Sequence, residues 1–386
     1  MRERSRFERE LSELEVAGGA PARYFAGEAG GPVVKLTHFH VRKFLDLGTK
    51  ALTPDPDPGV MTPTRMAVGY VLPADPRRQA LQSALTALVT ARYSSALSPT
   101  KPLRIAIADL TGAKQHAPVF AGISAFGANS EMEGASLPKI LALYAVHQLR
   151  FDLDTFAARN KIDKASVLRS AIVAEWKKEG LRSTPNLTGL FKFVEKAGSP
   201  VTAQLHKTHD VHHNSVARAL ILALGFEYIG SVALQSGLFD QAHGGLWLNA
   251  AYNRPAVTWT RTPFPRLQRH NATALGAASF FVLLAQGRLV NQSTSKEIGD
   301  ALAKHMCMGS SGLLDGIQAL GGVQSPSPNK CGDDPPFIHD AIHVIREVSP
   351  GKRIEYAVAV LSKKPPVVYF TVLGQDLDRL IVAANP

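Results

Sequence analysis

The chain has few cysteines and no long apolar run, and both absences limit the class of protein. Its 386 residues include two cysteines, Cys307 and Cys331, which cannot form a disulfide framework, although one bridge between them can form. No run of about 18 apolar residues occurs, which excludes a membrane-spanning helix. The N-terminal stretch MRERSRFEREL alternates charges and lacks the apolar segment of a signal peptide. We therefore expect a cytoplasmic protein without a membrane partner.

A basic stripe is also missing. The net charge is +11, but the 43 Lys and Arg are scattered along the chain and are not interleaved with aromatic residues. A nucleic-acid partner is therefore not expected. What is present is typical of a soluble globular protein: 45% of the residues are hydrophobic and 19% are charged. A chain of this length can bury one large core or two moderate ones.

The distribution of apolar and breaker residues predicts the organisation of the chain. Residues 1–75 are irregular and are predicted to be an N-terminal extension on a main domain, 76–386. Strands are predicted towards both ends of that domain with helices between them, which implies one α/β sheet whose sequence halves meet in space. The predicted helices cover 75–93, a segment after 136, several pieces of 153–199, 211–224, 228–235, 272–286, 293–306 and 375–384; the predicted strands cover 103–110, 118–126, a segment around 330, 338–348, 354–361 and 367–371.

A serine and a lysine lie three residues apart at the start of an apolar helical segment. Ser136 and Lys139 would share one face of a helix, so the amine could take the proton of the hydroxyl if burial lowers the pKa of the lysine. This is a Ser-x-x-Lys nucleophile pair. Since the two residue types are common, the spacing gains meaning only from its surroundings.

Three stretches of the sequence, one of which contains this pair, follow one another in the order found in a known protein family. The first, Arg104–Gly112 (RIAIADLTG), predicts a strand and a turn, and Ala135–Tyr144 (ASLPKILALY) contains the nucleophile pair. The third is Lys330–Gly332 (KCG), followed by the predicted strand Ile338–Val344. From about residue 78 onward the chain resembles the class A β-lactamase and penicillin-binding-protein family of serine acyl-enzymes.

The resemblance implies both a fold and a reaction. The fold would be an antiparallel sheet flanked by helices, formed by residues 100–130 and 325–386, with an all-helical subdomain at about 145–310. The reaction would be that of a serine acyl-enzyme hydrolase or acyltransferase on a small amide or ester, with no cofactor and no metal. Relatives of this kind are usually exported, unlike the expectation for this chain.

The resemblance also implies roles for individual residues. Ser136 would attack a carbonyl with Lys139 as base, and the oxyanion would lie between the backbone N–H groups of Ser136 and Asp333. Asp333 follows Gly332 in the third motif. Lys330 would supply a positive field that depresses the pKa of Lys139 and attracts an anionic substrate group.

The second motif of the family, Ser-x-Asn, has its counterpart in His212-His213-Asn214. Asn214 would point its amide at the substrate and at Lys139. His212 occupies the serine position, which is a departure from the family. A histidine can relay a proton to the leaving group, and this role is predicted for His212.

A second departure concerns the water that releases the acyl group. Class A enzymes carry a glutamate shortly before a Leu-Asn pair; here Leu248-Asn249 fits the pair, and the glutamate position falls on Gly245. No acidic residue occurs between Asp240 and Glu297, and we call the loop that follows Asp240 the acid-free loop. Efficient hydrolysis by the class A route is therefore not expected. Asn249 is still predicted to contact the substrate.

The third departure is Cys331, which replaces the usual Thr or Ser and removes a hydroxyl that often holds a substrate carboxylate. Together with Gly332 and Asp333 it is predicted to line the substrate site. A nucleophilic Cys331 is the alternative, but no Cys–His pair is present in the sequence, so a small packing residue is the better interpretation.

A second interpretation is open for three features: a group of four histidines, a group of three aromatic residues, and the catalytic role of the whole chain. The four histidines lie in a short stretch and could share a metal ion, but no acid-flanked zinc motif accompanies them, and local hydrogen bonds are the better interpretation. Three aromatic residues in the acid-free loop, two tryptophans and a tyrosine, could line the pocket or anchor the loop. The whole chain could also be a catalytically inactive member that binds a ligand in the old cleft. The histidines are His206, His209, His212 and His213, and the aromatic residues are Trp247, Tyr252 and Trp259.

Overall fold

The computed structural model describes somewhat more than half of the chain, all of it in the predicted main domain. The predicted N-terminal extension, 1–75, and nearly all of the predicted helical pieces in 153–199 lie outside it. The described residues are 76–97, 102–115, 117–124, 130–159, 161, 211–224, 226–240, 244–252, 270–304, 312–324, 327–363 and 368–386.

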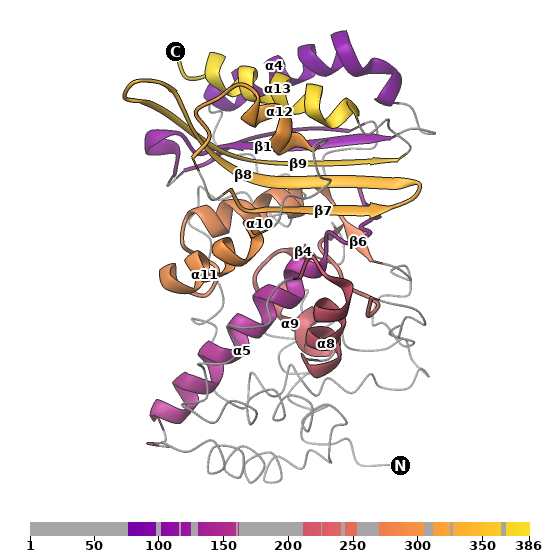
Figure 1. Cartoon of the computed structure of the whole chain (residues 1–386), viewed down its shortest axis with the longest axis vertical. Helices are drawn as coiled ribbons and strands as arrows, with labels where there is room; N and C mark the ends of the chain where they lie inside the picture. Colours follow the sequence, from indigo (N-terminus) through magenta and orange to yellow (C-terminus); the bar gives the residue numbers. More distant parts are fainter. Residues whose placement is uncertain are drawn as a thin grey trace, which may run out of the picture.

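A five-stranded antiparallel sheet with the strand order β2-β1-β9-β8-β7 forms the centre of the molecule (Figure 1). The predicted strands near the two ends of the domain do meet, because β1 pairs with β9 and places Ile107 opposite Val358. This confirms the predicted α/β fold with an antiparallel sheet. The strands are β1 (Leu103–Asp109), β2 (Val119–Ser124), β7 (Asn329–Asp334), β8 (Phe337–Ser349) and β9 (Lys352–Lys363).

Both faces of the sheet are covered, and β9 shows this most clearly. Tyr356 and Val358 belong to one buried cluster and Ala357 and Ala359 to another, because successive side chains of a strand point to opposite faces. We call the face of Tyr356 the outer face and that of Ala357 the inner face. Burial on both sides explains why the sequence of β9 is a continuous apolar run.

The outer face is covered by α4, α12 and α13 (Figure 1). The predicted helix 75–93 is confirmed, and its buried residues include Leu81, Leu85 and Val89. The predicted strand 367–371 is wrong, since residues 368–371 form the first turn of α13. The backbone there packs so closely on α12 that a Cβ added to Gly316 would lie 1.9 Å from the carbonyl oxygen of Thr371, so tertiary packing overrides the β propensity of this stretch. The helices are α4 (Pro76–Tyr93), α12 (Leu313–Gln318) and α13 (Val368–Ala383).

The inner face packs against α10, whose residues Ala274–Leu284 are all buried. A helix that is apolar all round belongs in a core, as this one does. Its N-terminus is capped by the Thr273 hydroxyl, which accepts from the Gly276 N–H at 2.9 Å. Beyond α10 lie the other helices on this side (Figure 1). They are α5 (Lys139–Arg159), α8 (Asn214–Leu224), α9 (Phe226–Gln235), α10 (Ala274–Ala285) and α11 (Gln292–Leu302).

Two short ladders that the sequence did not predict hold the acid-free loop in place. In the first, β3 pairs with β6 and Glu133 stands opposite Asn271. Asn271 also exchanges two backbone hydrogen bonds with Trp247, each 2.8 Å long. The start of the loop therefore lies beside the segment that leads to Ser136. The strands of the two ladders are β3 (Met132–Glu133), β6 (Asn271–Ala272), β4 (Phe239–Asp240) and β5 (Gly244–Gly245).

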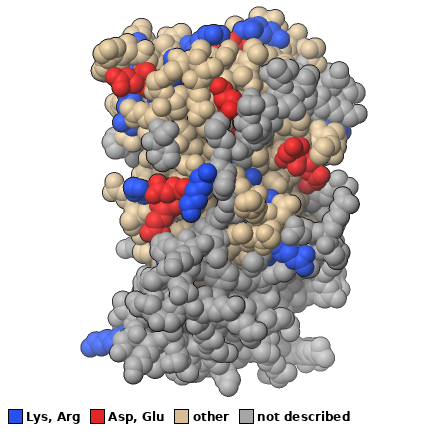
Figure 2. All heavy atoms as spheres, in the orientation of Figure 1, with Lys and Arg blue, Asp and Glu red and all other residues tan. Residues whose placement is uncertain are grey.

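Surface charge and helix hydrophobicity give no sign of an extended basic or membrane-embedded surface in the described residues. On the face shown in Figure 2, the basic and acidic side chains of these residues are interspersed. None of the described helices is both long and apolar enough to cross a bilayer.

Candidate active site

Ser136 lies in a tight turn that joins β3 to α5. The sequence predicted it on the helix, but α5 begins at Lys139, and Leu137 N–H donates to the Gly134 carbonyl at 2.9 Å within the turn. Ala135 has a φ of 46°, a left-handed conformation that costs a non-glycine residue free energy. Ser136 is partly exposed, whereas the side chains around it are buried. The turn therefore presents the hydroxyl at the edge of a packed core.

Lys139 is buried, with 1% of its surface exposed. Its ammonium donates to the Asn214 side-chain oxygen at the start of α8 and lies 4.3 Å from the centre of the Tyr252 ring. Among the described residues no carboxylate is paired with it. Burial lowers the pKa of Lys139 from 10.5 to about 8, because the charged form loses solvation. The predicted contact between Lys139 and Asn214 is thus present.

Two aromatic side chains complete the surroundings of Lys139. The Tyr252 hydroxyl donates to the Ala135 carbonyl at 2.8 Å, and the Tyr252 ring stacks on the His270 ring with centroids 4.4 Å apart. Burial, and then the charge of Lys139, lowers the pKa of His270 to about 3, so the imidazole is neutral. Sequence reasoning missed His270, because nothing nearby in the chain marks it.

The edge strand β7 brings the third motif beside the nucleophile turn. Gly332 packs so closely that an added Cβ would lie 2.8 Å from the Gly134 carbonyl oxygen and 3.1 Å from the Leu137 nitrogen. Lys330 is buried, and its ammonium donates to the Cys331 carbonyl at 2.7 Å. Asp333, which follows Gly332, is exposed. Only glycine permits this approach of two backbones.

His339 of β8 ties the sheet to the same turn. It stands opposite Gly332 in the β7–β8 register, and its Nε2 donates to the Glu133 carbonyl at 2.6 Å. Its Nδ1 accepts from the Ser362 N–H at 3.3 Å, which fixes the neutral tautomer. Burial lowers the pKa of His339 to about 4. The ring thus links β3, β8 and β9.

Cys331 is placed differently from Lys330. It is opposite Asp340 in the register and therefore shares the outer face with that residue, whereas Lys330 and Gly332 share the inner face with His339. Cys331 is disulfide-bonded, so it is not a free thiol; the other cysteine, Cys307, lies outside the described residues. Asp340 accepts from the Leu313 N–H at 2.8 Å, and burial raises its pKa to about 7.

The remaining predicted residues lie at the margins of this arrangement. A ring nitrogen of His212 is 3.2 Å from the Leu302 carbonyl at the end of α11, and the proton relay predicted for His212 stays a prediction. Asn249 is completely buried, and its backbone N–H donates to His270 Nδ1 at 3.4 Å. His206, His209 and Trp259 lie outside the described residues. Within the described part, no three potential metal-ligating side chains gather.

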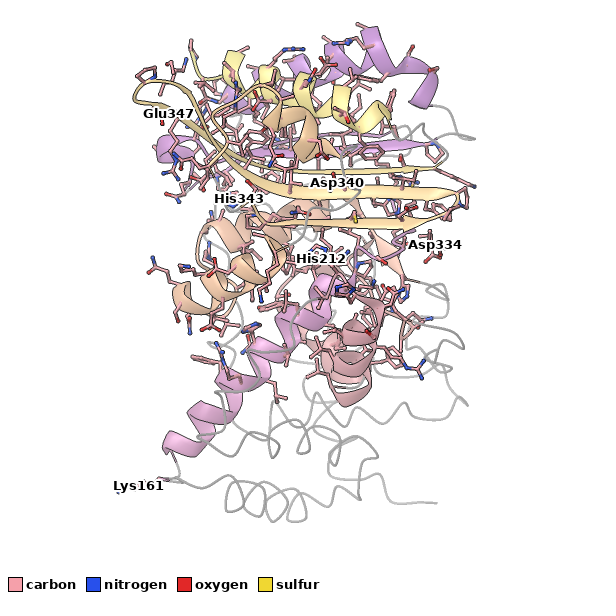
Figure 3. All side chains as sticks on the ribbon, viewed as in Figure 1. Lys161, His212, Asp334, Asp340, His343 and Glu347 are labelled. Atoms are coloured by element: carbon pink, nitrogen blue, oxygen red, sulfur yellow. The ribbon has the colours of Figure 1, made fainter. Side chains whose placement is uncertain are left out.

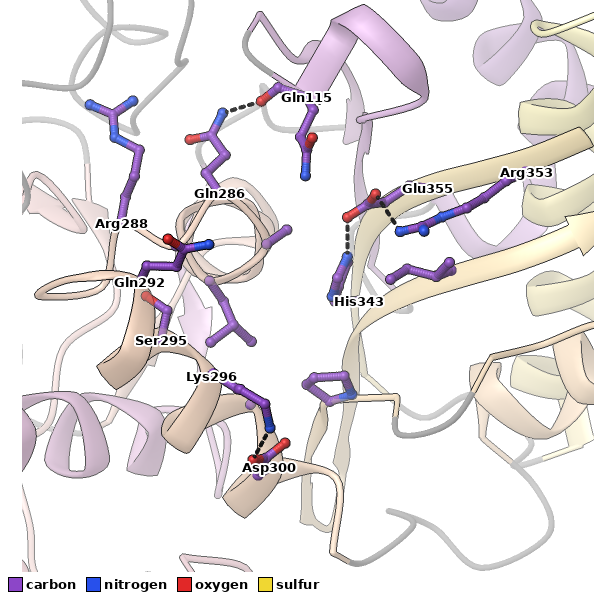
Figure 4. Close-up of a pocket in the computed structure, with 16 residues that line it drawn as sticks. Gln115, Gln286, Arg288, Gln292, Ser295, Lys296, Asp300, His343, Arg353 and Glu355 are labelled. Carbon is purple, nitrogen blue, oxygen red and sulfur yellow. Dashed lines mark hydrogen bonds and ion pairs between the residues drawn. The ribbon is translucent and has the colours of Figure 1, made fainter.

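A separate cavity of about 830 Å³ opens at the far end of α10, between that helix, α11 and the sheet (Figure 4). Its wall includes a buried ion pair, His343 Nε2 to Glu355 Oε1 at 2.9 Å, and Arg353 lies 3.3 Å from the same carboxylate. A second pair, Lys296 and Asp300, is 2.7 Å apart. Figure 3 shows Asp334, Asp340 and His343 in order along the β7–β8 hairpin, so the cavity lies at the end away from Asp334.

Comparison with known proteins gives structural likeness only. No family model and no curated relative matches the chain. A β-lactamase from Sphaerobacter thermophilus is 14% identical over 79% of this chain and 96% of its own, with a TM-score of 0.45. An ancestral class A β-lactamase, of the last common ancestor of Gram-negative bacteria, is 16% identical over 79% of this chain and 99% of its own, with a TM-score of 0.46. A penicillin-G acyl-enzyme of a PBP-A mutant is 14% identical over 80% of this chain and 96% of its own, with a TM-score of 0.44. Likenesses at such low identity and TM-score carry no argument about the reaction.

Proposed function

We propose that the chain is a serine acyl-enzyme hydrolase or acyltransferase for a small amide or ester, with Ser136 as nucleophile and Lys139 as base. The observation that carries this is the buried lysine one turn from a partly exposed serine. A pKa near 8 leaves a useful fraction of the amine neutral at neutral pH, which a general base requires. A solvated lysine with an ordinary pKa could not act in this way.

In the proposed acylation step, the Lys139 amine takes the proton of Ser136 Oγ as Oγ attacks the substrate carbonyl carbon. Negative charge then develops on the carbonyl oxygen, which the backbone N–H groups of Ser136 and Asp333 would bind. The close packing of Gly332 on the nucleophile turn supports this pairing of donors. Collapse of the tetrahedral intermediate expels the leaving group, which takes a proton, and leaves an ester on Ser136.

Lys330 and Asn214 would support this step. A second buried ammonium on the inner face adds a positive field that disfavours the charged form of Lys139 and attracts an anionic substrate group. The Asn214 oxygen, which accepts from Lys139, would orient the amine. His212 would relay to the leaving group the proton that Lys139 took from Ser136, which returns the amine to its neutral form.

Labelling with two acylating probes tests the proposal. A fluorescent penicillin and a fluorophosphonate are expected to label the protein covalently, and the label should vanish in Ser136→Ala. Ser293→Ala, which changes an exposed serine of α11, is the matched control and should label normally. If neither probe labels the intact protein, the acyl-enzyme proposal is wrong, and the ligand-binding alternative takes its place.

A further inference from the structure

The acid-free loop cannot carry a base where the family has one. Gly245 has a φ of 130°, and an added Cβ would lie 2.1 Å from the Leu238 carbonyl oxygen. At Gly244 the added Cβ would lie 2.7 Å from both Cγ and Oε1 of Glu131. The space beside the loop is therefore filled by backbone and by a glutamate of another segment. If water is activated here, the carboxylate must come from outside the loop.

The segment before the nucleophile turn carries two glutamates. Glu131 and Glu133 flank Met132, which is buried in the core, so both glutamates project from the opposite side of the strand. Glu131 reaches Gly244, as described above. Glu133 is three residues before Ser136 and is partly buried.

The charge of Glu133 acts on the nucleophile turn. The pKa of Tyr252 is raised by burial and then by the charges of Glu133 and Asp334, so both carboxylates lie near its hydroxyl. That hydroxyl donates to the carbonyl of Ala135, the residue before Ser136. Glu133 is thus tied to the nucleophile turn by the chain itself, three residues before Ser136, and by its pairing with Asn271.

Two buried amides, Asn271 opposite Glu133 and Asn249 beside His270, are suited to hold a water molecule. The Asn249 side chain is fully buried, and both its oxygen and its nitrogen have no partner among the described residues. Asn271, which stands opposite Glu133, is 7% exposed, and its side-chain nitrogen likewise has no partner in the described part of the chain. Buried polar atoms are almost always satisfied by protein or water, and a buried water needs two to four such partners.

We propose that Glu133 is the general base that hydrolyses the acyl-enzyme, acting on a water held by Asn249 and Asn271. Glu133 takes a proton from the water as the water oxygen bonds to the acyl carbonyl carbon. The tetrahedral intermediate then breaks its bond to Ser136 Oγ, which regains a proton from the Glu133 carboxylic acid, and the free acid leaves. The proposal rests on the proposed acyl-enzyme function, and it moves the base from the loop to β3.

The test compares Glu133→Gln with Glu131→Gln, a matched removal of a carboxylate two residues away. An activated ester is mixed with each protein, and intact mass follows the adduct while absorbance follows turnover. Glu133→Gln should acylate like the wild type but release the acyl group about 10²–10⁴-fold more slowly, so that the adduct accumulates. Glu131→Gln should turn over like the wild type. Acylation of Glu133→Gln at the normal rate also shows that the variant folds.

Four results would overturn the inference, and each has a different meaning. Normal turnover by Glu133→Gln would exclude Glu133 as the base. Accumulation of adduct in Glu131→Gln instead would assign the base to the glutamate beside Gly244. A wild-type adduct that is never released would show acylation without hydrolysis, which leaves the proposed nucleophile intact and removes the base. Absence of any wild-type adduct would reject the acyl-enzyme function itself.

Discussion

The inner face of the sheet carries two polar regions, one at each end of α10. They differ in whether a buried charged side chain has a partner of opposite charge. At the N-terminal end of α10, the ammonium of Lys139 is buried against an amide and an aromatic ring. At the C-terminal end, the charges around the cavity are met by opposite charges, as in the pair of His343 with Glu355 (Figure 4). The cavity is large. The lowered pKa values of Lys139 and His270 belong to the region at the N-terminal end of α10.

The difference shows that a large cavity and a side chain with a shifted pKa need not occur in the same place. A charge that is buried without a countercharge is destabilising, and its pKa moves towards the range where it can exchange protons near neutral pH. The polar side chains around the cavity instead lie beside partners, as His343 does beside Glu355. The Lys139 region therefore fits chemistry, and the His343 region fits structural support.

The largest expected effect comes from removing the Lys139 amine, with a substitution of His343 as the control. Lys139→Met should lower the rate of probe labelling by about 10²–10⁴-fold, the usual contribution of a general base, whereas His343→Gln should leave the rate unchanged. The measurement is the time course of fluorescent labelling at pH 8. Equal loss in the two variants would remove the distinction between the regions.

The second expected effect is a loss of folding stability on a substitution in the cavity wall at the C-terminal end of α10. Glu355→Gln should lower the free energy of unfolding by about 2 kcal/mol, because it replaces the charged acceptor of the buried His343 hydrogen bond with a neutral amide. Urea denaturation at pH 7 checks this. An unchanged urea midpoint would mean that the His343–Glu355 pair contributes nothing to stability, and the proposed structural role of this region would be wrong.

The third effect has the opposite sign at the nucleophile end. Lys139→Met should raise the free energy of unfolding at pH 7 by about 2 kcal/mol. Burial of the ammonium, whose pKa is near 8 in the folded state and 10.5 in its ordinary state, costs about 3 kcal/mol. The lost hydrogen bond to Asn214 offsets about 1 kcal/mol of the gain. Between the two pKa values the unfolded state binds more protons, so wild-type stability rises with pH and the advantage of the variant shrinks. Urea denaturation from pH 7 to 10 follows both trends. A destabilised variant would contradict the assignment.

The smallest effect is the pH dependence of labelling. Because the neutral amine is the reactive form, the rate should rise about tenfold per pH unit below pH 8 and level off above it. The His343→Gln variant should give the same profile. An inflection near 6 to 7 in the wild type would point to a histidine, and therefore to His212, as the base.

Much of the fold was predictable because periodicity is a local property. The helix at α4, the β1–β2 hairpin and the strands β8 and β9 follow from apolar spacing, whereas β7 (NKCGDD) has no apolar period and was predicted from the Lys-Cys-Gly motif. The stretch at 367–371 failed because its β-branched and aromatic residues favour a strand locally, while packing on α12 decides otherwise. The short β3–β6 pair has no local signal at all, since two residues are too few to show a period.

The candidate site divides in the same way. Ser136, Lys139, Asn214 and Lys330 stand in motifs, and the motifs could be read in order along the chain. His270 and the Glu133 carboxylate belong to no motif, and they reach the site only because β3, β6 and the loop after β5 lie side by side. Contacts made through such non-local pairing cannot be read from the spacing of residues.

The pairing of β1 with β9 also has a consequence for the synthesis of the chain. The hairpin of β1 and β2 leaves the ribosome before β9, so the edge of β1 that β9 covers stays open until residues 352–363 have emerged. An apolar strand with an open edge invites pairing with another chain, and domains dominated by distant contacts close slowly. Completion of this sheet therefore waits for β9, and the β1–β2 hairpin is the segment that a chaperone would have to protect in the meantime.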